Sequence, residues 1–189
     1  MTDGPIDLAI TFAALLESLD LDYALGGSVA ATFFGEPRTT IDVDFAVRLS
    51  HAALERVLAV AGPAFYVPEQ SALDAVATAS SFNLIHDSGL KIDVFVVGDG
   101  VLDTNQLRRR VRISARATPA AEIWITAPED LILRKLAWFR DGGEVSDRQW
   151  RDVVGLLRTQ RGFLDTAYLV ATASEVDLQS LLHRALALG

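Results

Sequence analysis

A glycine pair that separates two apolar segments is the feature that most constrains the fold of this chain. Residues 21–25 have the pattern of a short strand and residues 28–34 that of a helix, so Gly26 and Gly27 are expected to form the turn between them. Glycines allow a close approach of the backbone to a ligand, and the start of a helix presents unpaired N–H groups to an anion. Ser28 is expected at the N-cap. The segment therefore predicts a strand, a turn and a helix whose start can bind phosphate.

Two aspartates on the next expected strand suggest a site for a divalent metal ion. Residues 43–47 alternate into an apolar strand, and strand side chains have period two, so Asp42 and Asp44 project from one face roughly 7 Å apart. Mg²⁺ prefers hard oxygen ligands and usually takes one or two carboxylates together with substrate phosphates. The pair therefore has the ligand type that a magnesium site needs, and a third carboxylate would complete a site for two metal ions.

Asp93 is the candidate for the third carboxylate. It lies in the middle of the apolar segment 90–97, and an unpaired carboxylate is costly to bury in such a strand. The preceding segment 81–86 is a second strand, and residues 87–89 form a tight turn between the two. This hairpin can place Asp93 beside the Asp-x-Asp strand.

Each of these motifs is weak when it stands alone. A Gly-Gly turn before a helix is more often only a turn, and an Asp-x-Asp has many accidental matches. Asp93 by itself is equally consistent with an acid that is solvated at the edge of a sheet. The three motifs occur in the order turn, strand and strand, and this combination is far more specific than any one of them.

Together these residues resemble the nucleotidyltransferase-fold superfamily, with the closest likeness to AbiE-type toxin nucleotidyltransferases and their uncharacterised bacterial relatives. Residues 127–138 look like the Pro-Glu-Asp-Leu helix of that group, which carries a lysine, and residues 146–154 look like its following Arg/Asp helix. The resemblance covers residues 23–157. It implies an α/β (α+β) fold in which helices flank a nucleotidyltransferase-like mixed β-sheet, with a catalytic core at 1–126 and a C-terminal helical subdomain at 127–189.

The resemblance also implies an activity and a role for particular residues. The activity is Mg²⁺-dependent transfer of a nucleoside monophosphate from a nucleoside triphosphate (NTP) to an acceptor hydroxyl on RNA, protein or a small molecule. A toxin–antitoxin role with a cognate antitoxin is part of the same implication. The resemblance implies that Gly26, Gly27 and Ser28 bind the triphosphate. It implies that Asp42, Asp44 and Asp93 bind two Mg²⁺ ions, with Asp93 as a candidate base toward the acceptor. It also implies that Lys135 contacts the nucleotide phosphates and that Asp152 helps to shape the site.

Several residues have a structural alternative. A lysine near the middle of a helix, such as Lys135, is usually a solvated surface residue. Asp152 can pair with Arg148 or Arg151, and the Arg148 pair, at i, i+4 spacing, contributes only a few tenths of a kcal/mol. The segment Trp138-Phe139-Arg140 and Trp150 can stack on a nucleobase, although aromatic residues at helical spacing are more often part of the core.

Two other functions compete with nucleotidyl transfer. The first is a non-catalytic protein of the same fold, such as a nucleotide sensor or a toxin–antitoxin partner that kept the residues and lost turnover. The second is a serine hydrolase, because Gly26-Gly27-Ser28 between a strand and a helix loosely resembles a nucleophile elbow. That fold needs several strands before its elbow, and only one helix is expected here before the first strand.

The net charge of −8 argues against a general nucleic-acid binder, because the phosphate backbone favours basic surfaces. A local cluster of five arginines is the exception. It can contact a triphosphate or an RNA acceptor, or it can simply protect a solvated edge strand. The cluster comprises Arg108, Arg109, Arg110, Arg112 and Arg116.

The remaining patterns predict helices and strands around these motifs. We expect a cytoplasmic protein, since no apolar run approaches the eighteen or so residues that span a bilayer and acids precede any basic residue. Ser50 and Ser146 are expected to cap helices. The expected helices are 6–19, 51–61, one that starts at Pro128 and ends at Gly142-Gly143, one after Ser146, 165–173 and 175–188, and the further strands are 110–115 and 123–125.

Overall fold

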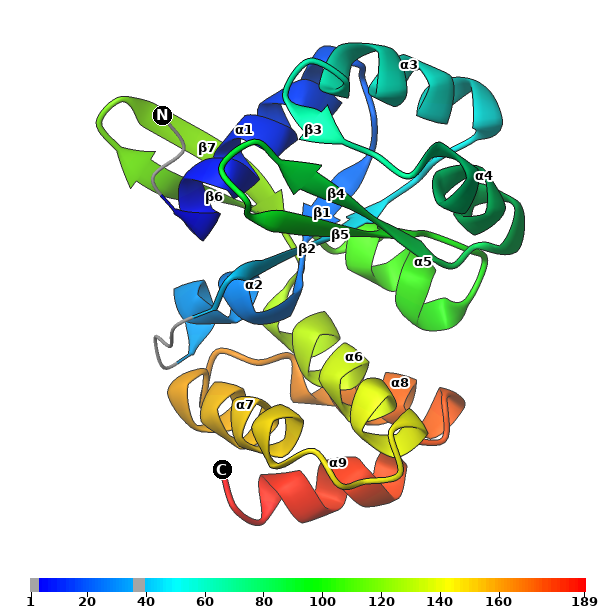
Figure 1. The fold of residues 1–189 in the computed structure, drawn as a ribbon. Helices are drawn as coiled ribbons and strands as arrows, with labels where there is room; N and C mark the ends of the chain where they lie inside the picture. The colour runs from blue at the N-terminus through cyan, green and yellow to red at the C-terminus, as the bar shows by residue number, and fades with distance from the viewer. Residues whose placement is uncertain (1–3, 36–39) are drawn as a thin grey trace.

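A seven-stranded mixed sheet is the centre of the molecule (Figure 1). The structure is a computed structural model that describes residues 4–35 and 40–189. The strand order is β3-β4-β5-β2-β1-β7-β6, in which β2 runs parallel to β5 and antiparallel to β1. The predicted mixed sheet flanked by helices is confirmed. The strands are β1 (Tyr23–Leu25), β2 (Asp42–Val47), β3 (Phe65–Tyr66), β4 (Ser81–His86), β5 (Lys91–Val96), β6 (Val111–Ala117) and β7 (Ala120–Ile125).

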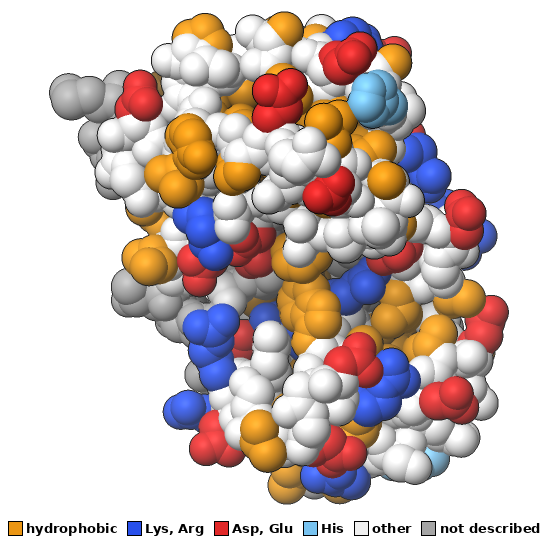
Figure 2. All heavy atoms as spheres, turned by 45° about the vertical axis from the view of Figure 1, so that its right-hand side comes forward, with side chains coloured by type: hydrophobic (Ala, Val, Ile, Leu, Met, Phe, Trp, Pro, Cys, Tyr) orange, Lys and Arg blue, Asp and Glu red, His pale blue; other side chains and the backbone are white. Residues whose placement is uncertain are grey.

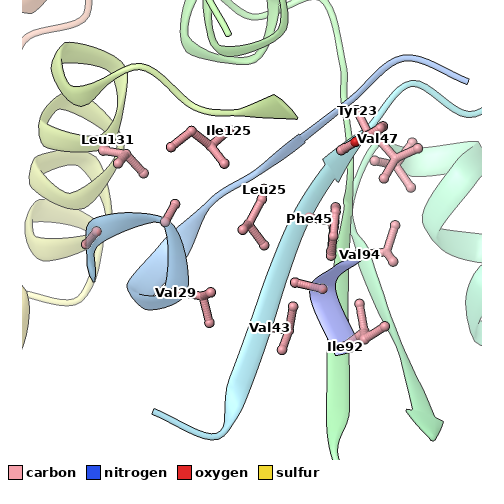
Figure 3. Close-up of a cluster of buried hydrophobic side chains, with 14 of the residues drawn as sticks. Tyr23, Leu25, Val29, Val43, Phe45, Val47, Ile92, Val94, Ile125 and Leu131 are labelled. Atoms are coloured by element: carbon pink, nitrogen blue, oxygen red, sulfur yellow. The ribbon is translucent and has the colours of Figure 1, made fainter. Parts of the chain in front are cut away.

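One face of the sheet is packed against helices and forms the main core. The alternation along β2 buries Val43, Phe45 and Val47 on this face, as Figure 3 shows. Phe12 of α1 (Pro5–Ser18) meets Phe45 edge to face, with ring centroids 5.1 Å apart. Helices α3 (His51–Ala61) and α4 (Glu69–Thr78) complete this side. The apolar half of the period-two pattern therefore accounts for the core, and the polar half must face elsewhere.

The opposite face carries the polar residues of the same strands. Helix α5 (Val101–Arg108) covers only one end of it, where Leu107 packs with Ala24 and Ala46. The rest of the face borders α2 (Gly27–Phe34) and the helices that follow the sheet. This incomplete cover leaves room for a site.

The last four helices lie together below the sheet in Figure 1. They are α6 (Pro128–Asp141), α7 (Asp147–Thr159), α8 (Thr166–Glu175) and α9 (Gln179–Leu186). Ser146 caps α7 by accepting a hydrogen bond from the N–H of Gln149, as predicted. The division of the chain at 126/127 stays a prediction. In the described part of the chain, none of the helices has the length and apolar character needed to cross a membrane.

Two local predictions are wrong in detail. Ser28 is not the N-cap of its helix: α2 begins at Gly27, and its N-cap is Gly26. The final helix begins at Gln179 and not at residue 175, because α8 extends to Glu175. By contrast, the helix 51–61 with its Ser50 cap and the hairpin of β4 and β5 are confirmed.

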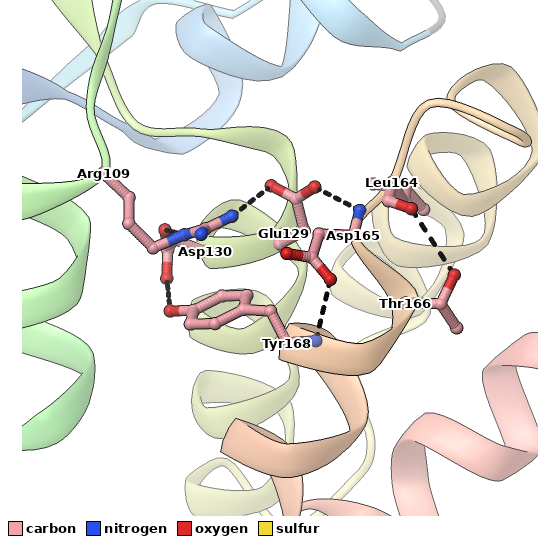
Figure 4. A network of polar contacts seen from close by, with 7 residues as sticks. All are labelled: Arg109, Glu129, Asp130, Leu164, Asp165, Thr166 and Tyr168. Carbon is pink, nitrogen blue, oxygen red and sulfur yellow. Dashed lines mark hydrogen bonds and ion pairs between the residues drawn. The ribbon is translucent and has the colours of Figure 1, made fainter.

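A buried ionic cluster attaches the C-terminal helices to the sheet (Figure 4). Arg109, which follows α5, contacts Glu129 and Asp130 in the first turn of α6, each at 3.3 Å. Its guanidinium also lies 3.6 Å from the ring centroid of Tyr168 on α8, and the Tyr168 hydroxyl donates to Asp130. Burial raises the pKa of Asp130, which is 2% exposed. The single arginine therefore neutralises acids that would be costly to bury alone.

The change Arg109→Met tests this attachment. It should lower the free energy of unfolding by about 3 kcal/mol, because it leaves two buried acids without their cation. Urea denaturation measures the loss. The matched control is Arg112→Met, which removes partly exposed pairs with Glu17 and Glu122 and should cost less than about 1 kcal/mol. Equal losses in the two variants would contradict the role assigned to Arg109.

Candidate active site

The pairing of β2 with β5 brings the three predicted aspartates together on the incompletely covered face. The parallel register sets Asp44 opposite Asp93, and Asp42 opposite Lys91. Because side chains two residues apart share a face, all four polar groups project to the same side of the sheet. The hairpin therefore delivers Asp93 to the position that the sequence suggested.

Sequence reasoning missed Lys91, which lies among these acids. Its ammonium is 2.8 Å from Asp93 Oδ2 and 3.7 Å from Asp42 Oδ1. The hydrogen bond to Asp93 raises the pKa of Lys91, so the side chain carries its positive charge. The signal was present in the sequence, because Lys91 precedes Asp93 by two residues and must share its strand face.

The acids have the right chemistry for a divalent cation, although they do not yet surround one point. Within residues 4–35 and 40–189, no three acidic or histidine side chains converge closely enough to hold a metal ion. Burial raises the pKa of Asp44, and the charge of Asp93 raises it further. Lys135 acts in the opposite direction on the same carboxyl. The cluster thus has hard oxygen ligands and an excess of negative charge that favours a bound cation.

The start of α2 touches this cluster directly. Gly27 has φ +58°, and a Cβ built on it would lie 1.7 Å from Asp44 Oδ2. The carboxylate of Asp44 accepts a hydrogen bond from the backbone N–H of Ser28, which explains why the Ser28 side chain is not needed as a cap. Only glycine fits at residue 27, because any side chain would collide with Asp44 and strain the backbone.

The position of Ser28 argues against the hydrolase alternative. Ser28 is only 6% exposed, whereas a nucleophile elbow displays its serine at the surface. The backbone N–H of Ser28 donates to the carboxylate of Asp44. The resemblance of the glycine segment to an elbow is therefore one of sequence only.

Lys135 and Asp152 join α6 to α7 beside the aspartates. The Lys135 ammonium donates a 2.8 Å hydrogen bond to Asp152 Oδ2, and Lys135 is only 2% exposed. The solvated-surface alternative for Lys135 is therefore wrong. Asp152 therefore has a partner on another helix, Lys135, which the surface-pair alternative did not include.

Two hollows meet at this site. The α5 hollow has a volume of about 230 Å³ and runs between the sheet, α5 and α6. The α7 hollow, of about 300 Å³, is lined by Ser28, Lys135, Arg148 and Gln149. Figure 2 shows hydrophobic, basic and acidic side chains gathered at the waist between the upper part of the molecule and the lower helices. The residues shared by both hollows are Gly27, Asp44, Phe95 and Trp138.

Trp138 differs from its neighbours in the helix. It is only partly buried and forms part of the wall of both hollows, with its ring 5.5 Å from that of Phe95. Phe139 is buried and packs on Trp150, 5.1 Å between centroids. The core alternative therefore describes Phe139 and Trp150, while Trp138 lies at the site.

The arginine cluster lies elsewhere, and all of its members except Arg108 pair with acids in the described part of the chain. Arg110 pairs with Asp22, and Arg116 pairs with Asp7. Arg112 pairs with Glu122 on the neighbouring strand. Arg112 and Arg116 lie in β6, the edge strand of the sheet, and Arg110 immediately precedes it. The structure thus favours the edge-strand alternative over contact with a triphosphate.

Comparison with known proteins identifies the fold. No protein-family model and no curated protein matched the sequence. Among solved structures, the chain is similar to an antigenic nucleotidyltransferase-like protein from Paracoccidioides brasiliensis, at 19% identity and a TM-score of 0.58 over 99% of this chain and 94% of that one. It is also similar to the antibiotic-resistance factor ANT(2'')-Ia, at 12% identity and a TM-score of 0.61 over 99% and 95%. A third similar structure is the lincosamide antibiotic adenylyltransferase LnuA, at 13% identity and a TM-score of 0.50 over 78% and 93%. The fold is therefore nucleotidyltransferase-like.

The raised pKa of Asp44 predicts a pH-dependent effect of Asp44→Asn on stability. The folded protein holds the Asp44 proton more tightly than the unfolded chain does, so the stability from this group is present at low pH and is lost as the pH rises through the folded-state pKa. Asparagine stays neutral. In the presence of a chelator, Asp44→Asn should raise the free energy of unfolding at neutral pH, and the gain should disappear below about pH 4.

Urea denaturation at a series of pH values measures the difference. The control is Asp99→Asn, in an exposed loop, which should change stability little at any pH. A variant at Asp44 that is less stable than the wild type at neutral pH would show that the carboxylate has a compensating partner.

Proposed function

We propose that this chain transfers a nucleoside monophosphate from an NTP to a hydroxyl group of an acceptor, with Mg²⁺ as cofactor. The observation that carries the proposal is the β2–β5 register, which sets Asp44 and Asp93 side by side at the start of α2. A helix start and a set of carboxylates are the two components that binding of a metal–triphosphate requires. The nucleotidyltransferase-like fold agrees with this chemistry.

The α7 hollow has the properties of a triphosphate site. It combines the first residues of α2 with the basic side chains of Lys135 and Arg148. Gln149 also lines it, and its side-chain oxygen is buried without a hydrogen-bond partner in the described part of the chain. Buried polar atoms normally have partners, so this group supports a polar ligand in the hollow.

The carboxylates Asp42, Asp44 and Asp93 would hold Mg²⁺ as one or two ions. When bound, the metal would neutralise phosphate charge and lower the pKa of the acceptor hydroxyl. Gly27, which has no side chain, would let the backbone approach the α-phosphate, and Asp93 is the proposed acceptor of the hydroxyl proton. In-line attack on the α-phosphorus would release pyrophosphate, with most of the rate coming from positioning and charge neutralisation.

The donor and the acceptor are narrower proposals. ATP is the first donor to test, because one structure with this fold belongs to an adenylyltransferase. RNA, a protein or a small molecule remain the candidate acceptors. Three further proposals rest on the sequence alone: a relation to AbiE-type toxins, a cognate antitoxin and a cytoplasmic location. The relation to AbiE-type toxins rests chiefly on residues 127–138 and 146–154.

A non-catalytic nucleotide-binding protein is the second candidate. The observation that favours it is the Lys91 ammonium, which bridges Asp42 and Asp93 where a metal ion would need their oxygens. In this alternative the fold would bind a nucleotide without turnover.

A binding and transfer experiment separates these candidates. Thermal shift with each of the four NTPs, with and without Mg²⁺, should show a Mg²⁺-dependent rise in Tm that Asp42→Asn/Asp44→Asn abolishes. The control is Asp99→Asn, which should retain the shift. Transfer of α-phosphate label to an RNA, protein or metabolite fraction supports catalysis, and a shift without transfer supports the non-catalytic candidate. Absence of any shift in the wild type would refute nucleotide binding.

The contact of Lys91 with the acids generates a second prediction. A metal ion must displace the ammonium from Asp93, so Lys91→Met should tighten Mn²⁺ binding about fivefold, equivalent to ~1 kcal/mol of relieved competition. Electron paramagnetic resonance of free Mn²⁺ measures the affinity without any turnover. Lys91→Arg retains the charge and should bind Mn²⁺ as the wild type does. Weaker binding by Lys91→Met would mean that the lysine orients the acids for the metal.

A further inference from the structure

We propose that the α5 hollow binds the base of the donor nucleotide, which stacks against Phe95 and Trp138 and is read by Gln106 and Thr126. This inference rests on the proposed function. Nothing in the comparisons assigns these four residues, and they come from four different elements or their ends: β5, α6, α5 and the segment after β7.

The wall of the hollow is suited to a planar ring. Phe95 and Trp138 lie with their centroids 5.5 Å apart and their planes at 36°, and both side chains are only partly buried. The rest of the lining includes small and apolar residues such as Ala46 and Leu131. Aromatic side chains that remain accessible in such a lining are platforms on which a heterocyclic base stacks.

A buried polar group without a partner lies in the wall of the same hollow. Thr126 is 1% exposed, lines the hollow, and its hydroxyl makes no hydrogen bond within the residues that the structure describes. Such a group costs free energy unless a ligand or water satisfies it. Gln106 is 7% exposed in the same lining and carries both a donor and an acceptor, which a base edge requires. The ionic side chains here, Arg134 and Asp103, already pair with each other.

The location favours the base over the acceptor. Asp93, the proposed base toward the acceptor, contributes to the lining of neither hollow. It lies with the half-exposed Asp42 and Lys91 at the more open part of the face. The α7 hollow has the basic groups for the phosphates, and the two hollows join at Asp44, where the α-phosphate would lie. The α5 hollow is then the space next to the α-phosphate that remains for the nucleoside.

Inorganic tripolyphosphate is the probe that separates the two hollows, because it has the phosphates of an NTP and no base. Calorimetry with Mg²⁺ present compares its affinity with that of the four NTPs. Trp138→Leu should weaken binding of the preferred NTP about tenfold and leave tripolyphosphate binding unchanged. Trp138→Phe keeps an aromatic ring and should recover most of the NTP affinity.

Gln106 provides an independent variant. Gln106→Leu should reduce the preference among the four NTPs and leave tripolyphosphate binding unchanged, while Gln70→Leu on the exposed side of α4 should alter neither. Equal weakening of both probes by Trp138→Leu would overturn the inference, as would an NTP affinity that Trp138→Leu leaves unchanged. If the wild type binds NTPs no more tightly than tripolyphosphate, the inference about the base is overturned and the proposed function is not. A wild type that binds neither overturns the proposed function as well.

Discussion

The contact between Gly27 and Asp44 is the constraint on which the rest of the site depends. There is no space for a Cβ at residue 27, since it would lie 1.7 Å from a carboxylate oxygen of Asp44. The start of α2 therefore packs against the face of β2 that carries Asp42 and Asp44. The Asp44 carboxylate accepts a hydrogen bond from the backbone N–H of Ser28. Gly27 and Asp44 line both hollows. The backbone that we propose to bind phosphate and the carboxylates that we propose to bind Mg²⁺ are thus one unit of structure, which depends on the absence of a side chain at residue 27.

Two lysines from different elements balance the charge of the aspartates, and they do so in different ways. Lys91 lies on the sheet beside its acids and is half exposed, so a competing cation can displace it. Lys135 is buried in α6, where Asp152 of α7 holds it. A buried ammonium needs that partner, and its charge still reaches Asp44. The C-terminal helices therefore take part in the electrostatics of the sheet and do more than cover it.

The sequence could predict what depends on neighbours in the chain. The period-two strands, the glycine turn and the caps at Ser50 and Ser146 are local, and the structure has them. The N-cap role of Ser28 was wrong because an acid on another strand satisfies the helix start. Arg109 and Asp130 pair across twenty-one positions of sequence, and that contact depends on how α6 packs. Local sequence patterns do not show which residues from separate elements meet when those elements pack. The ionic attachment and the two hollows could therefore be found only in the structure.

The distribution of charge decides how such a site can attract its ligand. The chain has a net charge of −8, which opposes an anionic triphosphate at long range. The arginines in the edge strand and just before it do not offset this field, because acids close by neutralise them. Attraction must then act within a Debye length of about 8 Å, through the start of α2, Lys135 and any cation held by the aspartates. A site of this kind favours a compact metal–triphosphate over an extended polyanion, since only the compact ligand places its whole charge inside that short range.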